Sequence, residues 1–307
     1  FRRVLFRSVK GDISHTVASW LRVNNLQIGA TGEYISSGTT GGNIEFRGDA
    51  VINGILRQQT AQDTTITGNM NITGSPIEFT IGELYVTAGN NAVFGIPNTT
   101  IASNPRVDGE ALFSGNVTLG GYALSPNMAY LGGTMTVEGN LSKLDGTNGQ
   151  IGNNTGGSLS VGGDLSWNSG SAFTVRNGCA VSVGGGLTVA GAADITVNAT
   201  SSLIVNSSVN CAQDVIANGT MTVGGNLVST GADGDITVGT GATLTVGGFA
   251  TITDDLITSG LFRVDGEYQG TGTGALITVN SGGNALFGMN ARIGDDMSVT
   301  GTATIAG

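Results

Sequence analysis

Two pairs of adjacent carboxylates, Asp254-Asp255 and Asp295-Asp296, are the side chains best placed to do chemistry in this sequence. Hydrolysis of a polysaccharide needs carboxylates that converge at a fixed separation. The pairs lie two repeats apart, so in a coiled chain they would share a face at about 9–10 Å. Recurrence of the same pair is typical of polar corners, and we predict that the chain is not an enzyme.

A calcium site is the second chemical candidate. The segment 231–236 reads GADGDI and resembles the calcium-binding nonapeptide of some parallel β-helices. Those sites are shared between successive copies, whereas this segment occurs once. Asp233 and Asp235 are therefore weak Ca²⁺ candidates, a solvated Asp-Gly turn is the favoured interpretation, and we predict no other cofactor.

Hydroxyl pairs are a third feature. Thr-x-Thr occurs at Thr220/Thr222, Thr243/Thr245, Thr251/Thr253 and Thr271/Thr273. A flat hydroxyl array of the kind that binds ice would need these pairs at one phase of the repeat. Residue counts place them at different phases, so the sequence predicts no such array.

A repeat predicts how the chain positions these residues. The pattern apolar-x-Gly-x-small-x-apolar-x-Gly runs over 46–54 and returns over 66–74, and further copies follow at steps of about 20–24 residues. Apolar residues alternate with Thr, Ser or Asn, which indicates strands with one buried face, and Gly or Asn supplies the corners. We predict an all-β, single-chain parallel β-helix (a β-solenoid), right-handed, with about 20–24 residues per turn.

Three finer expectations follow from this solenoid. Corner amides at Asn69, Asn116, Asn140 and Asn226 should stack into ladders. Gly219, Gly260 and Gly301 are evenly spaced, at twice the length of one repeat, and should lie two turns apart. The separation of Cys179 and Cys211 is not a whole number of repeats, so we expect two buried thiols instead of a disulfide.

The sequence divides into three segments. Residues 1–8 resemble the translation of a sequencing-library adapter and are excluded from the fold prediction. Residues 9–40 fit the repeat poorly, so they are expected to be a cap or the end of a preceding region. Residues 41–307 are the predicted solenoid, which stops within a repeat and is therefore expected to be truncated at its C-terminus.

Composition narrows the partners. Of 307 residues 53 are Gly and only 11% are charged, with a net charge of −10. This acidic balance argues against a nucleic-acid partner, which would need clustered Lys and Arg. No stretch approaches the roughly 18 apolar residues of a transmembrane helix.

Two families share the corner motifs. The segments 161–165 (VGGDL) and 223–227 (VGGNL) resemble corners in the passengers of autotransporter-type and other large bacterial surface adhesins. That resemblance implies a non-enzymatic, monomeric rod, secreted or on the cell surface, with host-surface or matrix glycans or proteins as partners. The segment 67–74 (TGNMNITG) resembles phage tail-fibre shafts, which would imply a homotrimer on a virion. A polysaccharide-degrading β-helix enzyme is the third alternative.

Overall fold

The computed structural model describes the strands between residues 26 and 131, and then residues 133–143, 149–151, 156–168 and 172–306 except Asp233. The expectations for residues 1–8, for Asn69 and for Asp233 lie outside the described residues. Of the stretch 9–40, the structure describes two strands, and both pair in parallel with later ones. Within the described part, no helix is long and apolar enough to cross a membrane.

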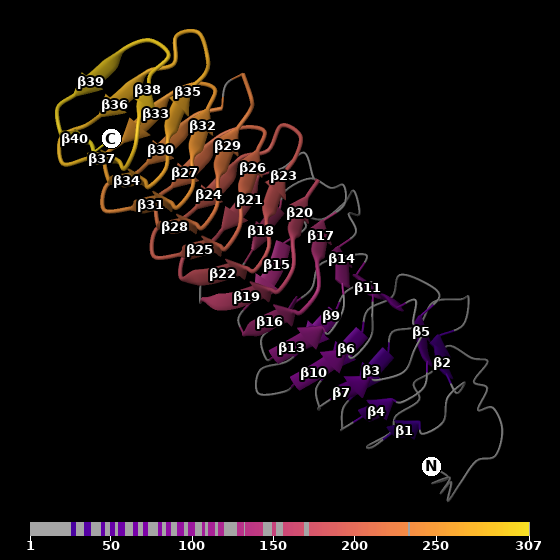
Figure 1. The fold of residues 1–307 in the computed structure, drawn as a ribbon. Coiled ribbons are helices and arrows are strands. Elements are labelled where there is room, and N and C mark those ends of the chain that lie inside the picture. Colours follow the sequence, from indigo (N-terminus) through magenta and orange to yellow (C-terminus); the bar gives the residue numbers. More distant parts are fainter. Residues whose placement is uncertain are drawn as a thin grey trace, which may run out of the picture.

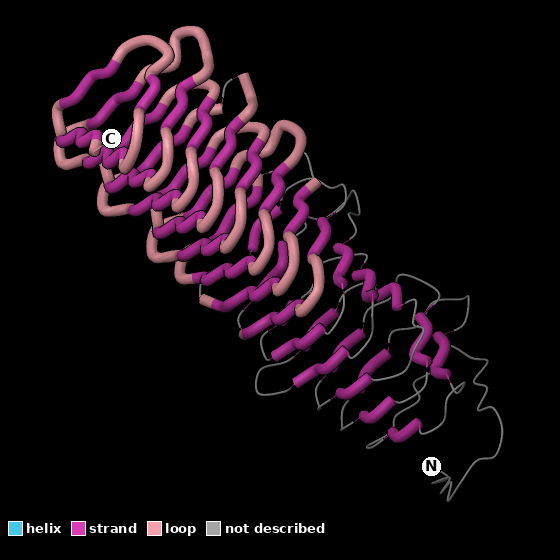
Figure 2. Tube along the Cα trace, viewed as in Figure 1, coloured by secondary structure: helices cyan, strands magenta, loops and turns pink. Residues whose placement is uncertain are grey.

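The chain is an all-β parallel solenoid whose described part consists of strands and loops (Figures 1 and 2). Three long sheets run along the rod, with 14, 11 and 13 strands, and a further pair of strands lies near one end. About eight turns fall in the part that is described almost continuously, from residue 133 onward. The predicted fold class is confirmed, while parallel pairing suits either hand of the coil, so the right-handed coil stays a prediction.

Neighbouring strands within each long sheet are three strands apart in the chain, because each turn contributes one strand to each sheet. The first sheet contains β1 (Leu26–Ile28), β4 (Ala50–Ile52), β7 (Met70–Ile72), β10 (Asn91–Phe94), β13 (Glu110–Phe113), β16 (Thr134–Val137), β19 (Gly157–Val161), β22 (Cys179–Val183), β25 (Ser202–Val205), β28 (Thr220–Val223), β31 (Thr243–Val246), β34 (Leu261–Val264), β37 (Asn284–Phe287) and β40 (Thr302–Ile305). The second contains β8 (Phe79–Ile81), β11 (Asn98–Ile101), β14 (Asn116–Leu119), β17 (Leu141–Lys143), β20 (Leu165–Trp167), β23 (Leu187–Val189), β26 (Val209–Cys211), β29 (Leu227–Ser229), β32 (Ala250–Ile252), β35 (Tyr268–Gly270) and β38 (Ala291–Arg292). The third contains β3 (Ile44–Phe46), β6 (Thr64–Ile66), β9 (Leu84–Val86), β12 (Arg106–Val107), β15 (Met128–Leu131), β18 (Gly149–Ile151), β21 (Phe173–Val175), β24 (Ile195–Val197), β27 (Val215–Ala217), β30 (Ile236–Val238), β33 (Leu256–Thr258), β36 (Ile277–Val279) and β39 (Met297–Val299), and the separate pair is β2 (Tyr34–Ser37) with β5 (Ile55–Gln58).

Turn length alternates along the C-terminal part of the rod. Hydrogen bonds between equivalent corner positions of successive turns measure it: the bond from Asn226 to Ser208 spans 18 residues, and the bond from Phe249 to Asn226 spans 23. Pairing in the first sheet shows the same order, with a short step from Val205 to Val223 and a long step from Val223 to Val246. The short turns fall below the predicted minimum of about 20 residues. In these turns the connection that leads into the third sheet and the connection that leads back into the first sheet are both shorter, while the strands keep their length.

The alternation explains the glycine spacing. Gly219, Gly260 and Gly301 directly precede β28, β34 and β40, which are alternate strands of the first sheet. The prediction that they lie two turns apart is confirmed.

The core is a set of stacked aliphatic and aromatic columns. Along β22 the burial alternates, with Cys179, Val181 and Val183 inward. Phe94 stacks on Phe113 one turn later, with ring centroids 4.5 Å apart. Each buried side chain of this size contributes about 1.5–3 kcal/mol.

The two cysteines and one lysine complete the core. Cys179 and Cys211 are both buried free thiols, which confirms the prediction against a disulfide. Lys143 is also buried, and its ammonium lies over the ring of Trp167 at 5.9 Å from the ring centroid. This cation–π contact, together with the long aliphatic stem, lets a charged residue occupy an inward position.

The prediction about the threonine pairs is wrong for two of the four. Thr220 pairs with Thr243 and Thr222 with Thr245, so these pairs share one phase on the first sheet. Thr251 lies on the second sheet, and Thr271/Thr273 follow β35. Alternating turn lengths make residue counting a poor guide to phase.

Candidate functional site

A column of aspartates precedes the strands of the third sheet. Asp194, Asp214, Asp235 and Asp255 directly precede β24, β27, β30 and β33, whose residues pair in register. Because successive parallel strands lie about 4.8 Å apart, the four carboxylates stack along the rod. We call the segments that lead into these strands (190–194, 212–214, 230–235 and 253–255) the aspartate corner.

Each carboxylate in the column is bound by the backbone of the next turn. Oδ1 of Asp194 accepts the N–H of Asp214 (3.3 Å), and Oδ1 of Asp214 accepts the N–H of Asp235 (2.9 Å). Oδ1 of Asp235 accepts the N–H of Asp255 (3.0 Å), whose own Oδ1 accepts the N–H of Leu276 (2.8 Å). The column is therefore a hydrogen-bonded ladder that satisfies a corner N–H in each turn.

The predicted acidic pairs lie on this column. Asp255 and Asp296 occupy equivalent positions two turns apart, with Leu276 between them. This confirms that the two pairs share a face. Parallel spacing separates Asp255 and Asp296 by about 9–10 Å, wider than the roughly 5–5.5 Å of a retaining glycosidase, and an apolar side chain stands between them.

Three carboxylates gather at one point of the aspartate corner. One oxygen each from Asp235, Asp254 and Asp255 lies within 4.8 Å of the others, and all three side chains are half-buried. The structure thus joins Asp235, one of the two weak Ca²⁺ candidates, with the acidic pair Asp254-Asp255. Oxygen donors suit Ca²⁺, but that ion takes about six to eight of them. The ladder already brings Asp235 and Asp255 together, so it accounts for the cluster.

Buried polar groups support the aspartate corner from inside. The Cys211 thiol donates to the carbonyl oxygens of Ala193 and Asp214, both at 3.6 Å. One turn later, the hydroxyl of Ser229 donates to the carbonyl oxygens of Gln213 and Gly234, both at 3.1 Å. These contacts satisfy carbonyl groups that the corner turns toward the core.

Burial shifts the pKa of two side chains near this corner. It raises the pKa of the Cys211 thiol to about 11, with smaller upward contributions from the charges of Asp194 and Asp214. Burial also raises the pKa of the Tyr268 phenol, and the charge of Asp255 adds a smaller upward contribution. Both groups are therefore neutral at physiological pH, and neither is an activated nucleophile.

A second ladder lies between the first and second sheets. Oδ1 of Asn116 accepts the N–H of Asn140 (2.9 Å), whose Oδ1 accepts the N–H of Asp164 (2.8 Å). Later in the rod, Ser208 binds the N–H of Asn226, and Asn226 binds that of Phe249. The predicted ladder positions Asn116, Asn140 and Asn226 are thus ladder members, but their oxygens bind backbone N–H groups and not one another. Sequence reasoning missed Asp164 and Ser208 because only their position in the corner marks them.

Glycines make room for this second ladder. From 138–140 to 288–290 the connection is three residues long in every described turn, and we call it the glycine corner. A Cβ at Gly184 would overlap the carbonyl oxygen of Gly162 in the turn before, and a Cβ at Gly185 would overlap Oδ1 of Asp164. The Val-Gly-Gly motif is therefore a consequence of backbone stacked directly on backbone.

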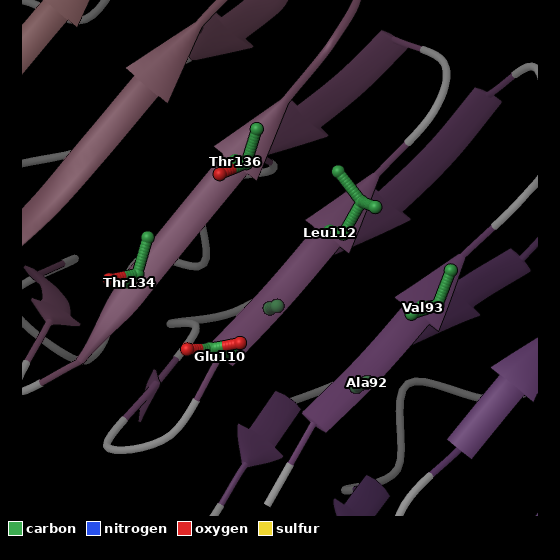
Figure 3. Close-up of a pocket in the computed structure, with 7 residues that line it drawn as sticks. Ala92, Val93, Glu110, Leu112, Thr134 and Thr136 are labelled. Atoms are coloured by element: carbon green, nitrogen blue, oxygen red, sulfur yellow. The ribbon is translucent and has the colours of Figure 1, made fainter.

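A shallow hollow of about 250 Å³ lies on the first sheet (Figure 3). Val93, Glu110, Leu112, Thr134 and Thr136 of β10, β13 and β16 surround it, with Ala92 and Ala111 beneath. It combines one carboxylate with hydroxyl and methyl groups. Such a lining can hold water or a hydroxylated surface, but it brings no second acid to Glu110 for hydrolysis.

No family model, no curated protein and no solved structure matches this chain. The evidence for its role is therefore its own geometry. The chain is a parallel β-solenoid of three sheets whose acidic corner is bound into a backbone ladder.

Proposed function

We propose that the chain is a non-enzymatic extracellular rod, with a structural or adhesive role in a bacterial surface or secreted protein. The observation that carries the proposal is the closure of the core within a single chain. Inward residues of all three sheets, such as Val205, Leu227 and Ile236, are fully buried without a second chain. A rod of this kind can stand alone as a spacer, with its length set by the number of turns.

The chemistry of the aspartates supports the non-enzymatic part of the proposal. Asp255 binds a backbone N–H, and its equivalent Asp296 lies two turns away. Catalytic carboxylates need freedom to exchange protons or attack a sugar, whereas the Asp255 carboxylate is bound to the backbone of the next turn.

The surface supports the choice of partners. The chain carries 12 basic and 22 acidic residues, so nucleic acids are unfavourable partners. Outward positions of the strands are mostly Thr, Ser and Asn, which suit contacts with glycans or proteins of a host surface or matrix.

The assembly state tests the proposal against the tail-fibre alternative. Size-exclusion chromatography with light scattering on the full chain should give a monomer of 30.8 kDa. Small-angle scattering should give the profile of an elongated particle. A stable trimer would overturn the proposal and favour a fibre shaft.

An activity screen tests the enzyme alternative. Wild type and the double variant Asp255→Asn, Asp296→Asn should both leave a panel of bacterial and plant polysaccharides uncleaved. Cleavage by wild type that the double variant loses would establish an enzyme. Binding to immobilised matrix proteins or to a glycan array separates an adhesive rod from a purely structural one.

A further inference from the structure

Two columns of hydroxyl groups run along the outer side of the first sheet. From β16 to β31, the inward residues of each strand are buried and the alternate residues face outward. Ten of the twelve outward residues are Thr or Ser. We call this surface the hydroxyl face, and it consists of Thr134, Thr136, Ser158, Ser160, Ala180, Ser182, Ser202, Ile204, Thr220, Thr222, Thr243 and Thr245.

Strand pairing fixes these side chains on a rectangular net. Thr134 pairs with Ser158 and Thr136 with Ser160, and the same register continues to Thr243 and Thr245. Neighbours along the rod axis are therefore about 4.8 Å apart, and neighbours along a strand about 6.6 Å apart. The hydroxyl of Ser158 donates to that of Thr134 at 3.2 Å, so adjacent turns present their oxygens in line.

Charge is confined to the borders of the hydroxyl face. None of its twelve residues is ionisable, while Glu110 stands one turn before it and Arg263 one turn after it. The strands of the second and third sheets are mostly three residues long, so each presents a single outward column. The aspartate column also lies beside the third sheet. Of the described surfaces, the hydroxyl face alone is two columns wide and neutral over six successive strands.

We propose that the hydroxyl face binds the surface of ice. Exposed planes of hexagonal ice present oxygens on a rectangular net whose two repeats are close to those of the hydroxyl face. Threonine and serine hydroxyls both donate and accept hydrogen bonds, so they can substitute for surface water molecules. Ion hydration would orient water differently, which makes the neutrality of the face part of the fit.

Rigidity makes the weak contacts additive. Each hydroxyl–water contact is worth little alone, because the same hydroxyl is hydrated in solution. The sheet holds the ten hydroxyl-bearing residues at fixed spacing, so they need little further ordering when they meet a crystal with the same repeat. The contacts can then act together. Ala180 and the exposed Ile204 add apolar surface without adding charge.

The test is partition of the purified full chain into a slowly growing polycrystalline ice hemisphere, combined with measurement of thermal hysteresis. Wild type should be enriched in the ice fraction and should shape ice crystals, while serum albumin is excluded. Thr222→Tyr, which raises a bulky ring within the hydroxyl face on β28, should reduce both signals to the albumin level. Thr237→Tyr, an outward substitution on β30 of the third sheet, is the matched control and should retain both.

Three outcomes would overturn the inference. The first is exclusion of wild type from ice, and the second is full ice binding by Thr222→Tyr when circular dichroism shows both variants folded. Co-sedimentation with crystalline cellulose or chitin, in the absence of ice partition, would point to a crystalline polysaccharide and would also overturn it. The proposed rod function is tested separately by light scattering, so a monomeric rod that is excluded from ice refutes only this inference.

Discussion

The glycine corner and the aspartate corner solve the same hydrogen-bonding problem under different constraints. In both, a side-chain oxygen accepts a backbone N–H from the next turn. In the described turns from residue 138 onward the glycine corner is three residues long, and backbone bonds such as Gly185 N–H to Gly163 O (2.9 Å) continue around it. The aspartate corner varies from three to six residues and tolerates Gln213 and Asp254 directly before the ladder aspartate. Stacked backbone, and not the ladder, fixes corner length.

The corners also differ on their inner side. Val183 and Leu187 flank the glycine corner and are wholly apolar and buried. The aspartate corner instead turns carbonyl groups inward, where Cys211 and Ser229 bind them. The tight corner thus lacks side chains in most of its turns, although the turn 206–208 carries three, and the variable corner depends on added polar ones.

The largest expected effect lies in the glycine corner. Gly184→Ala places a methyl group on the carbonyl oxygen of Gly162, and neither backbone can withdraw without breaking sheet bonds. We expect a loss of about 2–3 kcal/mol in unfolding free energy, measured by urea denaturation followed by circular dichroism. Gln213→Ala in the aspartate corner should cost less than about 0.5 kcal/mol. Equal losses at both sites would remove the distinction between the corners.

An alkaline titration tests the inner support of the aspartate corner. The Cys211 thiol ionises near pH 9.0 when unfolded and near 11 in the folded chain. Between these values the folded state binds more protons, so this group's contribution to stability is full below pH 9 and falls as the pH rises toward 11. The decrease should be on the order of 2 kcal/mol. Thermal melts across this alkaline range should show this loss of stability in wild type. A plot of stability against pH for Cys211→Ala should lack it. Parallel slopes would contradict the assignment.

The smallest expected effects distinguish the hydrogen-bond acceptor of a ladder residue from its negative charge. Asp214→Ala and Asn140→Ala each remove one ladder acceptor, so both should cost about 1 kcal/mol. Asp214→Asn keeps the acceptor oxygen and removes one of four stacked like charges. It should therefore match or slightly exceed wild-type stability at low salt, and this difference should shrink as salt is added. A loss equal to that of Asp214→Ala would show that the ladder depends on the negative charge.

Local patterns in the sequence predicted the architecture well. Alternation in segments such as Thr243–Val246 marks strands with one buried face, and the Val-Gly-Gly corners mark the glycine corner. The spacing of Gly219 from Gly260 captured the two-turn period because one long and one short turn always sum to the same length in this part of the rod.

Features that depend on strand register could not be predicted from the sequence. Residue counts put Thr220/Thr222 and Thr243/Thr245 at different phases, but variable corners absorb the difference and leave the strands aligned. For the same reason, the approach of Asp235 to Asp254 and Asp255 could not be foreseen from their separation along the chain.

Parallel stacking also determines how the rod would respond to force. The bonds between turns run along the axis, so tension applied to the two ends loads them in their opening direction, one turn after another. Each turn that detaches would release about 18–24 residues, or a contour of about 60–80 Å, in place of a rise of about 4.8 Å. The molecule would then lengthen in discrete steps from its ends. It would act as a tether that dissipates tension by unfolding one turn at a time while the remaining turns stay folded.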